Sequence, residues 1–314
     1  MKKSLGLIFL LLPLLFALAK VEPVNNPRQL IEAQAGFFMN PKWSPNGRKI
    51  AYTAANYKGL WILDMASGRT NQLSDELSAG YGFEWSSDSR YICSRVSKYE
   101  GVRRYNAIKL FDTEGTGSKL LTDYTTFMPA TPQFANGHVY LYMNNKLHRY
   151  DTGVQNLKKR IADTSLVFLA DDRIAISNLV TGEMNWIGEQ NDERYLNPAL
   201  SPDGERIACE VYGGNLIIMD KDGSSRIDLG PGYHPHWSPN GNYIVYMISK
   251  DDGHRITSSD LYVAGADGSE ITRLTDTEER YEMNPRWSPD GSRIVYDDYK
   301  SGKLFTVKID FTLD

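Results

Sequence analysis

The chain has 314 residues, of which 41% are hydrophobic and 24% charged, and its formal net charge at pH 7 is −4. An acidic balance without a basic stripe excludes a general nucleic-acid binder. A chain of this length buries enough surface on folding to be stable without disulfide bonds. The two cysteines, Cys93 and Cys209, are therefore predicted to be buried apolar residues rather than a disulfide.

The N-terminus has the pattern of a secretory signal peptide. Lys2 and Lys3 precede an apolar run over residues 5–18, and Ala17-Leu18-Ala19 supplies small residues for cleavage after Ala19. The run is short for a membrane span, and no cysteine is present for a lipid anchor. We predict a signal peptide over 1–19, a single mature domain over 20–314 without a transmembrane span, and a periplasmic or secreted location.

A tryptophan-anchored phrase, W-S-P-(N/D)-G, repeats along the mature chain. Clear copies begin at Trp43, Trp237 and Trp287, and weaker copies begin at Trp85 and Leu200. Two worn copies are placed by register at Phe134 and Phe168. The mean spacing of these seven anchors is about 41 residues, which is typical of a β-propeller blade.

The last repeats show how one blade is built. A short strand ends at the anchor, the turn Pro289-Asp290-Gly291 follows, and Arg293-Ile294-Val295-Tyr296 forms a β-branched and aromatic second strand. Such second strands are apolar at nearly every position, which predicts that neighbouring blades cover both faces. The sequence therefore predicts an all-β, closed β-propeller of four-stranded antiparallel blades.

The blade count and the ring closure can also be predicted. Seven anchors indicate seven blades, with six as the alternative if the sparse stretch 165–196 merges with a neighbour. The last copy, over 285–310, lacks a fourth strand. Residues 27–31 lie ahead of the first anchor as an outer strand does, so we expect them to complete the last sheet and close the ring.

Because the strands of a blade are antiparallel, successive loops lie on alternate faces of the ring. The long and variable loops all lie on the same face. Function on a repeat scaffold concentrates where loops vary. Two long hairpins follow second strands, at 95–107 and 249–259. Their candidate binding residues are Tyr99, Arg103, Arg104, His254 and Arg255.

The loops between blades each carry an aromatic residue shortly before the anchor. The set contains Phe37, Phe38, Phe127 and the candidate binding residues Tyr81, Tyr195, Tyr233 and Tyr281. One interpretation is an aromatic collar that grips a protein or glycan, and the other is that each ring covers the end of its own blade.

His234 and His236 place two imidazoles on one side of a strand, and both are candidate binding residues. A zinc site needs at least three ligands, and the sequence shows no third. We therefore predict no metal and no cofactor.

The phrase P-x-W-S-P-D-G over Pro285–Tyr296, with D-G-x-x-x-x-R-L-T over Asp267–Thr275, resembles the WD40-like (PD40) repeats of the TolB family. The resemblance covers most of residues 27–310. It implies a periplasmic propeller of the cell envelope that binds the peptidoglycan-associated lipoprotein. TolB proteins also carry an N-terminal α/β domain and usually have six blades, whereas here the first blade follows the leader within about twenty residues. Related propellers occur in prolyl-oligopeptidase-type peptidases and oligogalacturonate lyases.

Two functions remain open from the sequence. The first is a monomeric, non-catalytic TolB-like scaffold that binds an envelope protein or a glycan through the face with the long loops. The alternative is a polysaccharide lyase or hydrolase at the channel mouth, using His234, His236, Arg255 or Arg104 as base and cation.

Overall fold

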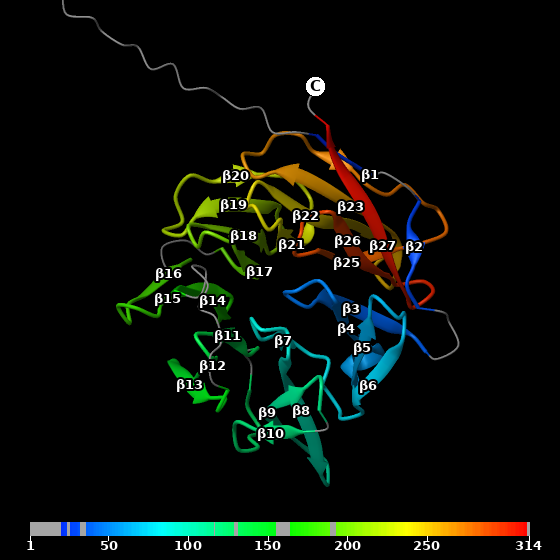
Figure 1. Cartoon of the computed structure of the whole chain (residues 1–314). Coiled ribbons are helices and arrows are strands. Elements are labelled where there is room, and N and C mark those ends of the chain that lie inside the picture. Colours follow the sequence, from blue (N-terminus) through cyan, green and yellow to red (C-terminus); the bar gives the residue numbers. More distant parts are fainter. Residues whose placement is uncertain are drawn as a thin grey trace, which may run out of the picture.

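The computed structural model describes residues 20–23, 26–31, 36–115, 117–128, 131–154, 164–188 and 193–312. These residues form seven antiparallel sheets around one axis (Figure 1) and one short 3-10 helix, Ala55–Tyr57. The protein is thus an all-β propeller with seven blades, as the anchor spacing predicts. The predicted signal peptide over 1–19 lies outside the described residues. Within them, no helix has the length and hydropathy needed to span a membrane.

Each blade uses consecutive strands, and its first strand lies nearest the axis (Figure 1). Blade 1 contains β3 (Phe38–Trp43), β4 (Lys49–Ala54), β5 (Leu60–Asp64) and β6 (Thr70–Ser74). Blade 2 contains β7 (Glu84–Trp85), β8 (Tyr91–Glu100), β9 (Arg103–Asp112) and β10 (Ser118–Leu120). Blade 3 contains β11 (Gln133–Ala135), β12 (His138–Met143) and β13 (Lys146–Asp151), and blade 4 contains β14 (Ser165–Ala170), β15 (Arg173–Asn178) and β16 (Met184–Ile187).

The second half of the ring follows the same order. Blade 5 contains β17 (Tyr195–Leu200), β18 (Arg206–Val211), β19 (Leu216–Asp220) and β20 (Ile227–Asp228). Blade 6 contains β21 (Tyr233–Trp237), β22 (Tyr243–Asp251), β23 (Ile256–Gly265) and β24 (Thr272–Arg273). Blade 7 contains β25 (Glu282–Trp287), β26 (Arg293–Asp298) and β27 (Lys303–Thr312). Blades 3 and 4 have three strands in the described part of the chain, and the sparse stretch 165–196 still forms its own blade.

The N-terminal segment closes the ring at blade 7. The predicted closing strand is β2 (Arg28–Gln29), which pairs antiparallel with β27 through Arg28 opposite Thr306. A further strand, β1 (Lys20–Pro23), pairs with the other end of β27 and was not foreseen from the sequence. Val21 of β1 is 1% exposed and lies in the core shared by blades 6 and 7. Both segments together therefore supply the missing outer strand.

The repeated turn explains the repeated phrase. In blade 1 the backbone N–H of Gly47 donates to Ser44 O at 2.9 Å, and the Ser44 hydroxyl donates to Asn46 Oδ1 at 2.8 Å. The N–H of Lys49 then donates to Ser44 Oγ at 2.9 Å, so the buried serine ties the two strands together. Glycine is required because its φ is +70°, a region that other residues rarely adopt.

The hydrophobic core lies between the blades rather than in one centre. Trp237 of blade 6 packs with Leu216 and Ile218 of blade 5, and Trp287 of blade 7 packs with Val245 of blade 6. Each anchor therefore faces the preceding blade, and by strand alternation its sequence neighbour faces the next one. Cys93 and Cys209 are buried and free in this core, as predicted.

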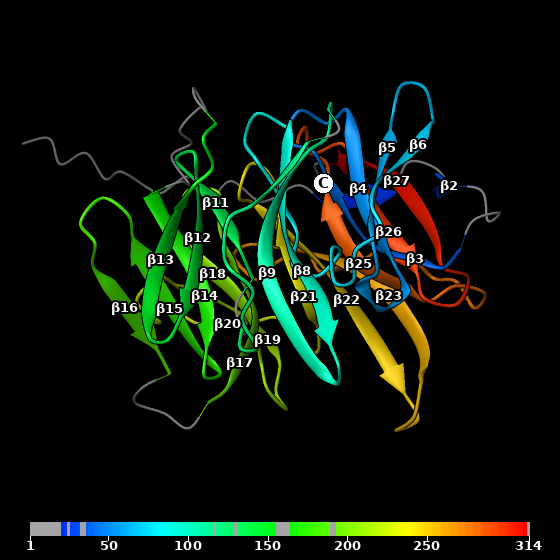
Figure 2. The ribbon, with the colours of Figure 1, turned by 90° about the horizontal axis from the view of Figure 1, so that it is seen from below.

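The two faces of the ring differ in relief. Turns between first and second strands and between third and fourth strands are short and lie on one face. The hairpins β8–β9 and β22–β23 extend beyond the ring on the other face (Figure 2). That face also carries the connections between blades, and we call it the long-loop face.

Candidate functional site

Exposed apolar side chains gather on the long-loop face. Twelve large hydrophobic residues in the described part of the chain are exposed, and nine belong to the loops or strand ends of this face. They are Phe37, Leu77, Tyr99, Val102, Phe127, Val180, Tyr212, Tyr233 and Tyr299. The connections of the opposite face are mostly Ser-Pro-Asn-Gly-like turns. An excess of exposed apolar residues on one face indicates a surface for a partner.

The hairpin β8–β9 presents a mixed aromatic and basic tip. Tyr99 is 57% exposed and Arg103 is also exposed. Arg104 is held in place instead: its Nη2 donates to Ser97 Oγ at 3.0 Å and also to Ser78 Oγ. Lys98 lies over the Tyr124 ring, with Nζ 4.4 Å from the ring centroid. The hairpin is therefore anchored at its base and free to contact a partner at its tip.

The tip of β22–β23 is shaped by one carboxylate. The backbone N–H groups of His254 and Arg255 both donate to Asp252 Oδ1 at 2.9 Å. Arg255 Nε lies 3.6 Å from Asp252 Oδ2, and both candidate side chains are exposed. The turn is thus ordered by hydrogen bonds, while the imidazole and guanidinium remain accessible.

The interblade aromatics do not form a uniform collar. Tyr195 is fully buried, and its hydroxyl donates to Glu193 Oε2 at 2.7 Å, so it covers the end of its own blade. Tyr81 and Tyr281 are half-buried: Arg95 lies 3.9 Å from the Tyr81 ring centroid and Lys300 lies 5.3 Å from that of Tyr281.

Tyr233, by contrast, is 41% exposed. Phe38 is buried, whereas Phe37 and Phe127 are exposed. Some of these rings are therefore buried within their blades, whereas others are exposed on the surface.

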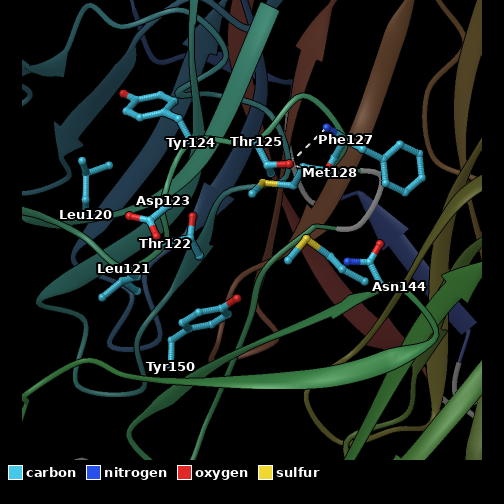
Figure 3. Close-up of a pocket in the computed structure, with 11 residues that line it drawn as sticks. Leu120, Leu121, Thr122, Asp123, Tyr124, Thr125, Phe127, Met128, Asn144 and Tyr150 are labelled. Atoms are coloured by element: carbon cyan, nitrogen blue, oxygen red, sulfur yellow. Dashed lines mark hydrogen bonds between the residues drawn. The ribbon is translucent and has the colours of Figure 1, made fainter.

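A cavity of about 530 Å³ opens on the long-loop face between blades 2 and 3 (Figure 3). The connection 120–128 lines one side, and Asn144 and Tyr150 of blade 3 line the other (Figure 3). Met143 of blade 3 also belongs to the lining. The lining mixes apolar and aromatic side chains with polar ones, and Asp123 is a charged member. This site could not be predicted from the sequence, because the connection carries no repeat motif. Its apolar residues, such as Leu121 and Met128, were the only available signal.

His234 and His236 lie on β21, the inner strand of blade 6. His234 has φ +54°, and Asn40, Asn197 and Asn284 hold the same position in other blades with similar positive φ. Its backbone N–H donates to Glu210 Oε1 of blade 5 at 2.7 Å. In the described residues no three His, Cys, Asp or Glu side chains come together as a metal site.

Burial and the nearby Arg286 guanidinium lower the pKa of His234 to about 4. Burial, Arg286 and Lys42 also hold the pKa of His236 well below its ordinary value. Both imidazoles are therefore neutral at pH 7. Arg104 and Arg255 lie on the hairpins β8–β9 and β22–β23 of blades 2 and 6, so the four residues considered for catalysis are not brought together.

Sequence reasoning missed two cations near the axis, Lys42 on β3 and Arg286 on β25. Burial, followed by the charge of Arg286, lowers the pKa of Lys42 to about 8. Burial lowers the pKa of Arg286 to about 10. Each immediately precedes its anchor tryptophan, which was the signal that could have found them.

No protein-family model matches this chain, and no curated protein sequence matches it. Solved structures do match. TolB from Acinetobacter baumannii is 17% identical over 84% of this chain and 60% of its own, with a TM-score of 0.58. A protein assigned as TolB from Agrobacterium tumefaciens is 17% identical over 95% of this chain and 100% of its own, with a TM-score of 0.58. A chain of the mitotic checkpoint complex is 12% identical over 100% of this chain and 98% of its own, with a TM-score of 0.62.

Such identities establish the fold alone. The chain has the propeller fold of the TolB propeller domains, and it spans 60% of the length of the Acinetobacter protein.

Proposed function

We propose that this protein is a non-catalytic binding scaffold of the bacterial periplasm that engages an envelope protein through the long-loop face. The observation that carries the proposal is the gathering of exposed apolar side chains on that one face. A surface of exposed tyrosines, two phenylalanines and accessible arginines has the composition of protein-binding hot spots. The TolB-like fold adds the peptidoglycan-associated lipoprotein as the first partner to test.

The cavity between blades 2 and 3 gives this surface a place where one side chain of the partner can insert. Phe127 at its edge is 63% exposed, and Met128 inside it is buried. An apolar side chain of the partner that entered this cavity would be shielded from water on several sides, which is how interface anchors contribute most of their free energy. A glycan that stacked on the same aromatic rings is the second ligand class to include in the test.

Site-specific photo-crosslinking in the native host tests the proposal. A crosslinker at Tyr99, Tyr233 or Phe127 is expected to give one protein adduct, identified by mass spectrometry. The matched control is Ile271, which is 51% exposed in a turn of the opposite face. Equal adducts from Ile271 and Tyr233, or none from any of the three long-loop positions, would refute the proposal.

The proposed location has its own test. Signal-peptide cleavage after Ala19 leaves Lys20, the first residue of β1, as the mature N-terminus. The mature chain then retains the complete closing segment. N-terminal sequencing of the protein from a periplasmic fraction is expected to begin at Lys20. A start at Met1 in the cytoplasmic fraction would contradict the periplasmic assignment.

A further inference from the structure

In several blades the residue immediately before the anchor has a polar side chain. This side chain forms a hydrogen bond with the backbone of the next blade. Lys42 Nζ donates to Phe83 O of blade 2 at 2.7 Å. Glu84 Oε2 accepts from the N–H of Phe134 in blade 3 at 3.1 Å. His236 Nδ1 accepts from the N–H of Trp287 in blade 7 at 3.3 Å. Such bonds satisfy polar groups in the narrow part of the ring.

Arg286 holds the same position in blade 7 and differs from the others. Its guanidinium makes no hydrogen bond and no ion pair with any residue in the described part of the chain, although it has five N–H donors. Asp297, whose negative charge acts on Arg286, accepts its hydrogen bonds from Asn40 and Asn284 instead. The charge of Arg286 is thus left without direct compensation.

The inner strands also lack a contact on both sides of Arg286. The indole N–H of Trp85 donates to Lys42 O at 3.2 Å, and that of Trp237 donates to Ala199 O at 2.9 Å, so each bond ties two inner strands together. The indole nitrogens of Trp287 and Trp43, on the two sides of blade 7, have no such partner in the described residues. The two junctions of blade 7 therefore lack the indole hydrogen bond that Trp85 and Trp237 make at theirs.

The three residues are only partly buried. Lys42, His236 and Arg286 each retain part of their accessible surface, although burial is the main cause of their lowered pKa values. His236 accepts through Nδ1 while it is neutral, so its proton resides on Nε2, which is a second type of donor. Three donor groups thus lie on the adjacent inner strands β21, β25 and β3 of blades 6, 7 and 1.

We propose that Arg286, Lys42 and His236 form a binding site for a small oxyanion, a carboxylate or a phosphate group. A planar guanidinium presents paired N–H donors that match two oxygens of such a group, and the ammonium adds a point charge. A bound oxyanion satisfies the free donors of Arg286 and offsets the repulsion between the two cations. The site is independent of the long-loop face and does not require the partner proposed above.

Calorimetry and thermal unfolding of the full-length mature protein at pH 7 test this site. Inorganic phosphate and succinate are titrated separately at constant ionic strength, with sodium chloride as the reference. We expect at least one oxyanion to bind and to raise the melting temperature, because a ligand that binds only the folded state stabilises it. The two titrations show whether phosphate or carboxylate is preferred.

Two variants locate the binding. Arg286→Gln and Lys42→Met are each expected to weaken binding at least tenfold, whereas the control Arg69→Gln, at an exposed position between β5 and β6, leaves the affinity unchanged. If Arg286→Gln fails to fold by circular dichroism, Lys42→Met decides by the same criterion. The proposal is overturned if neither oxyanion stabilises the wild type beyond sodium chloride, or if a folded Arg286→Gln or Lys42→Met protein binds as the wild type does.

Discussion

Asp297 in the last blade accepts a hydrogen bond from the backbone N–H of Asn40 in the first blade at 2.9 Å, across 257 residues of sequence. The same Oδ1 accepts from Asn284 Nδ2 at 3.0 Å. Glu210 makes the corresponding contacts between blades 5 and 6, with Asn197 Nδ2 at 2.7 Å and the N–H of His234 at 2.7 Å. A buried carboxylate thus joins blades at two junctions, one of which is the closure of the ring.

The ionisation of Asp297 is expected to oppose folding. Burial raises its pKa from 3.8 to about 7, although its hydrogen bonds act in the opposite direction. Because the pKa of Asp297 is higher in the folded than in the unfolded protein, protonation of this carboxyl favours folding. This contribution to stability is fully present below pH 3.8 and is lost as pH rises toward 7. The loss attributable to this group is at most about 4 kcal/mol.

Asp297→Asn removes this titration while keeping an oxygen acceptor. We expect the unfolding free energy of the variant, relative to that of the wild type, to increase as pH rises from 4 to 8. Urea unfolding at intervals across that range measures the difference. Parallel curves for the two proteins would show that Asp297 does not titrate with a raised pKa.

The closing segment is expected to contribute to the stability of the whole ring. Val21 is 1% exposed against Trp287 and Ile309, so Val21→Ala removes two buried methyl groups at a cost of about 1.6 kcal/mol. Deletion of residues 20–31 removes both β1 and β2 and should lower the melting temperature much further, because it exposes an edge of β27. Arg28→Ala, at an exposed side chain of β2, serves as the control. Differential scanning calorimetry that found an unchanged melting temperature after the deletion would rule out closure by this segment.

Much of the fold follows from sequence because each blade repeats its own turn chemistry. Trp43, Trp237 and Trp287 give the period, and the apolar second strands indicate that both faces are covered. The strand β1 was missed because Lys20–Pro23 is short and has no repeat motif. Its role depends on pairing with β27, almost three hundred residues away.

The binding residues of the long-loop face and the inner strands were harder to predict, because side-chain exposure depends on packing between blades. Tyr195 and Tyr233 occupy similar sequence positions, yet the first is buried and the second exposed. Lys42 and Arg286 belong to inner strands, where a charged residue suggests a solvent-facing side when only one strand is considered. Their proximity to His236 becomes visible only once blades 6, 7 and 1 are adjacent.

Gly80 fits against Thr53 of the preceding blade with no spare room. A Cβ on Gly80 would lie 1.8 Å from Thr53 Oγ1 and 2.1 Å from its Cβ. Thr53 is fully buried, and its hydroxyl donates to Gly59 O at 2.9 Å, so it cannot move without losing that bond. We expect Gly80→Ala to destabilise the protein by about 3 kcal/mol or more.

Gly117→Ala serves as the control, because a Cβ there meets nothing within 4 Å, and it should change the midpoint of urea unfolding little. Equal midpoints for the two variants would contradict this close packing.

His234→Asn is expected to stabilise the protein in acid. The pKa of His234 falls from 6.5 to about 4 on folding, so its stabilising effect is present above pH 6.5 and is lost as pH falls toward 4. The loss is at most about 3 kcal/mol. Asparagine removes the titration and tolerates the positive φ, as Asn40, Asn197 and Asn284 already do at this position. The variant should therefore unfold at higher urea concentration than the wild type at pH 4.5, with a smaller difference at pH 8. A difference that is independent of pH would mean that His234 is not the titrating group.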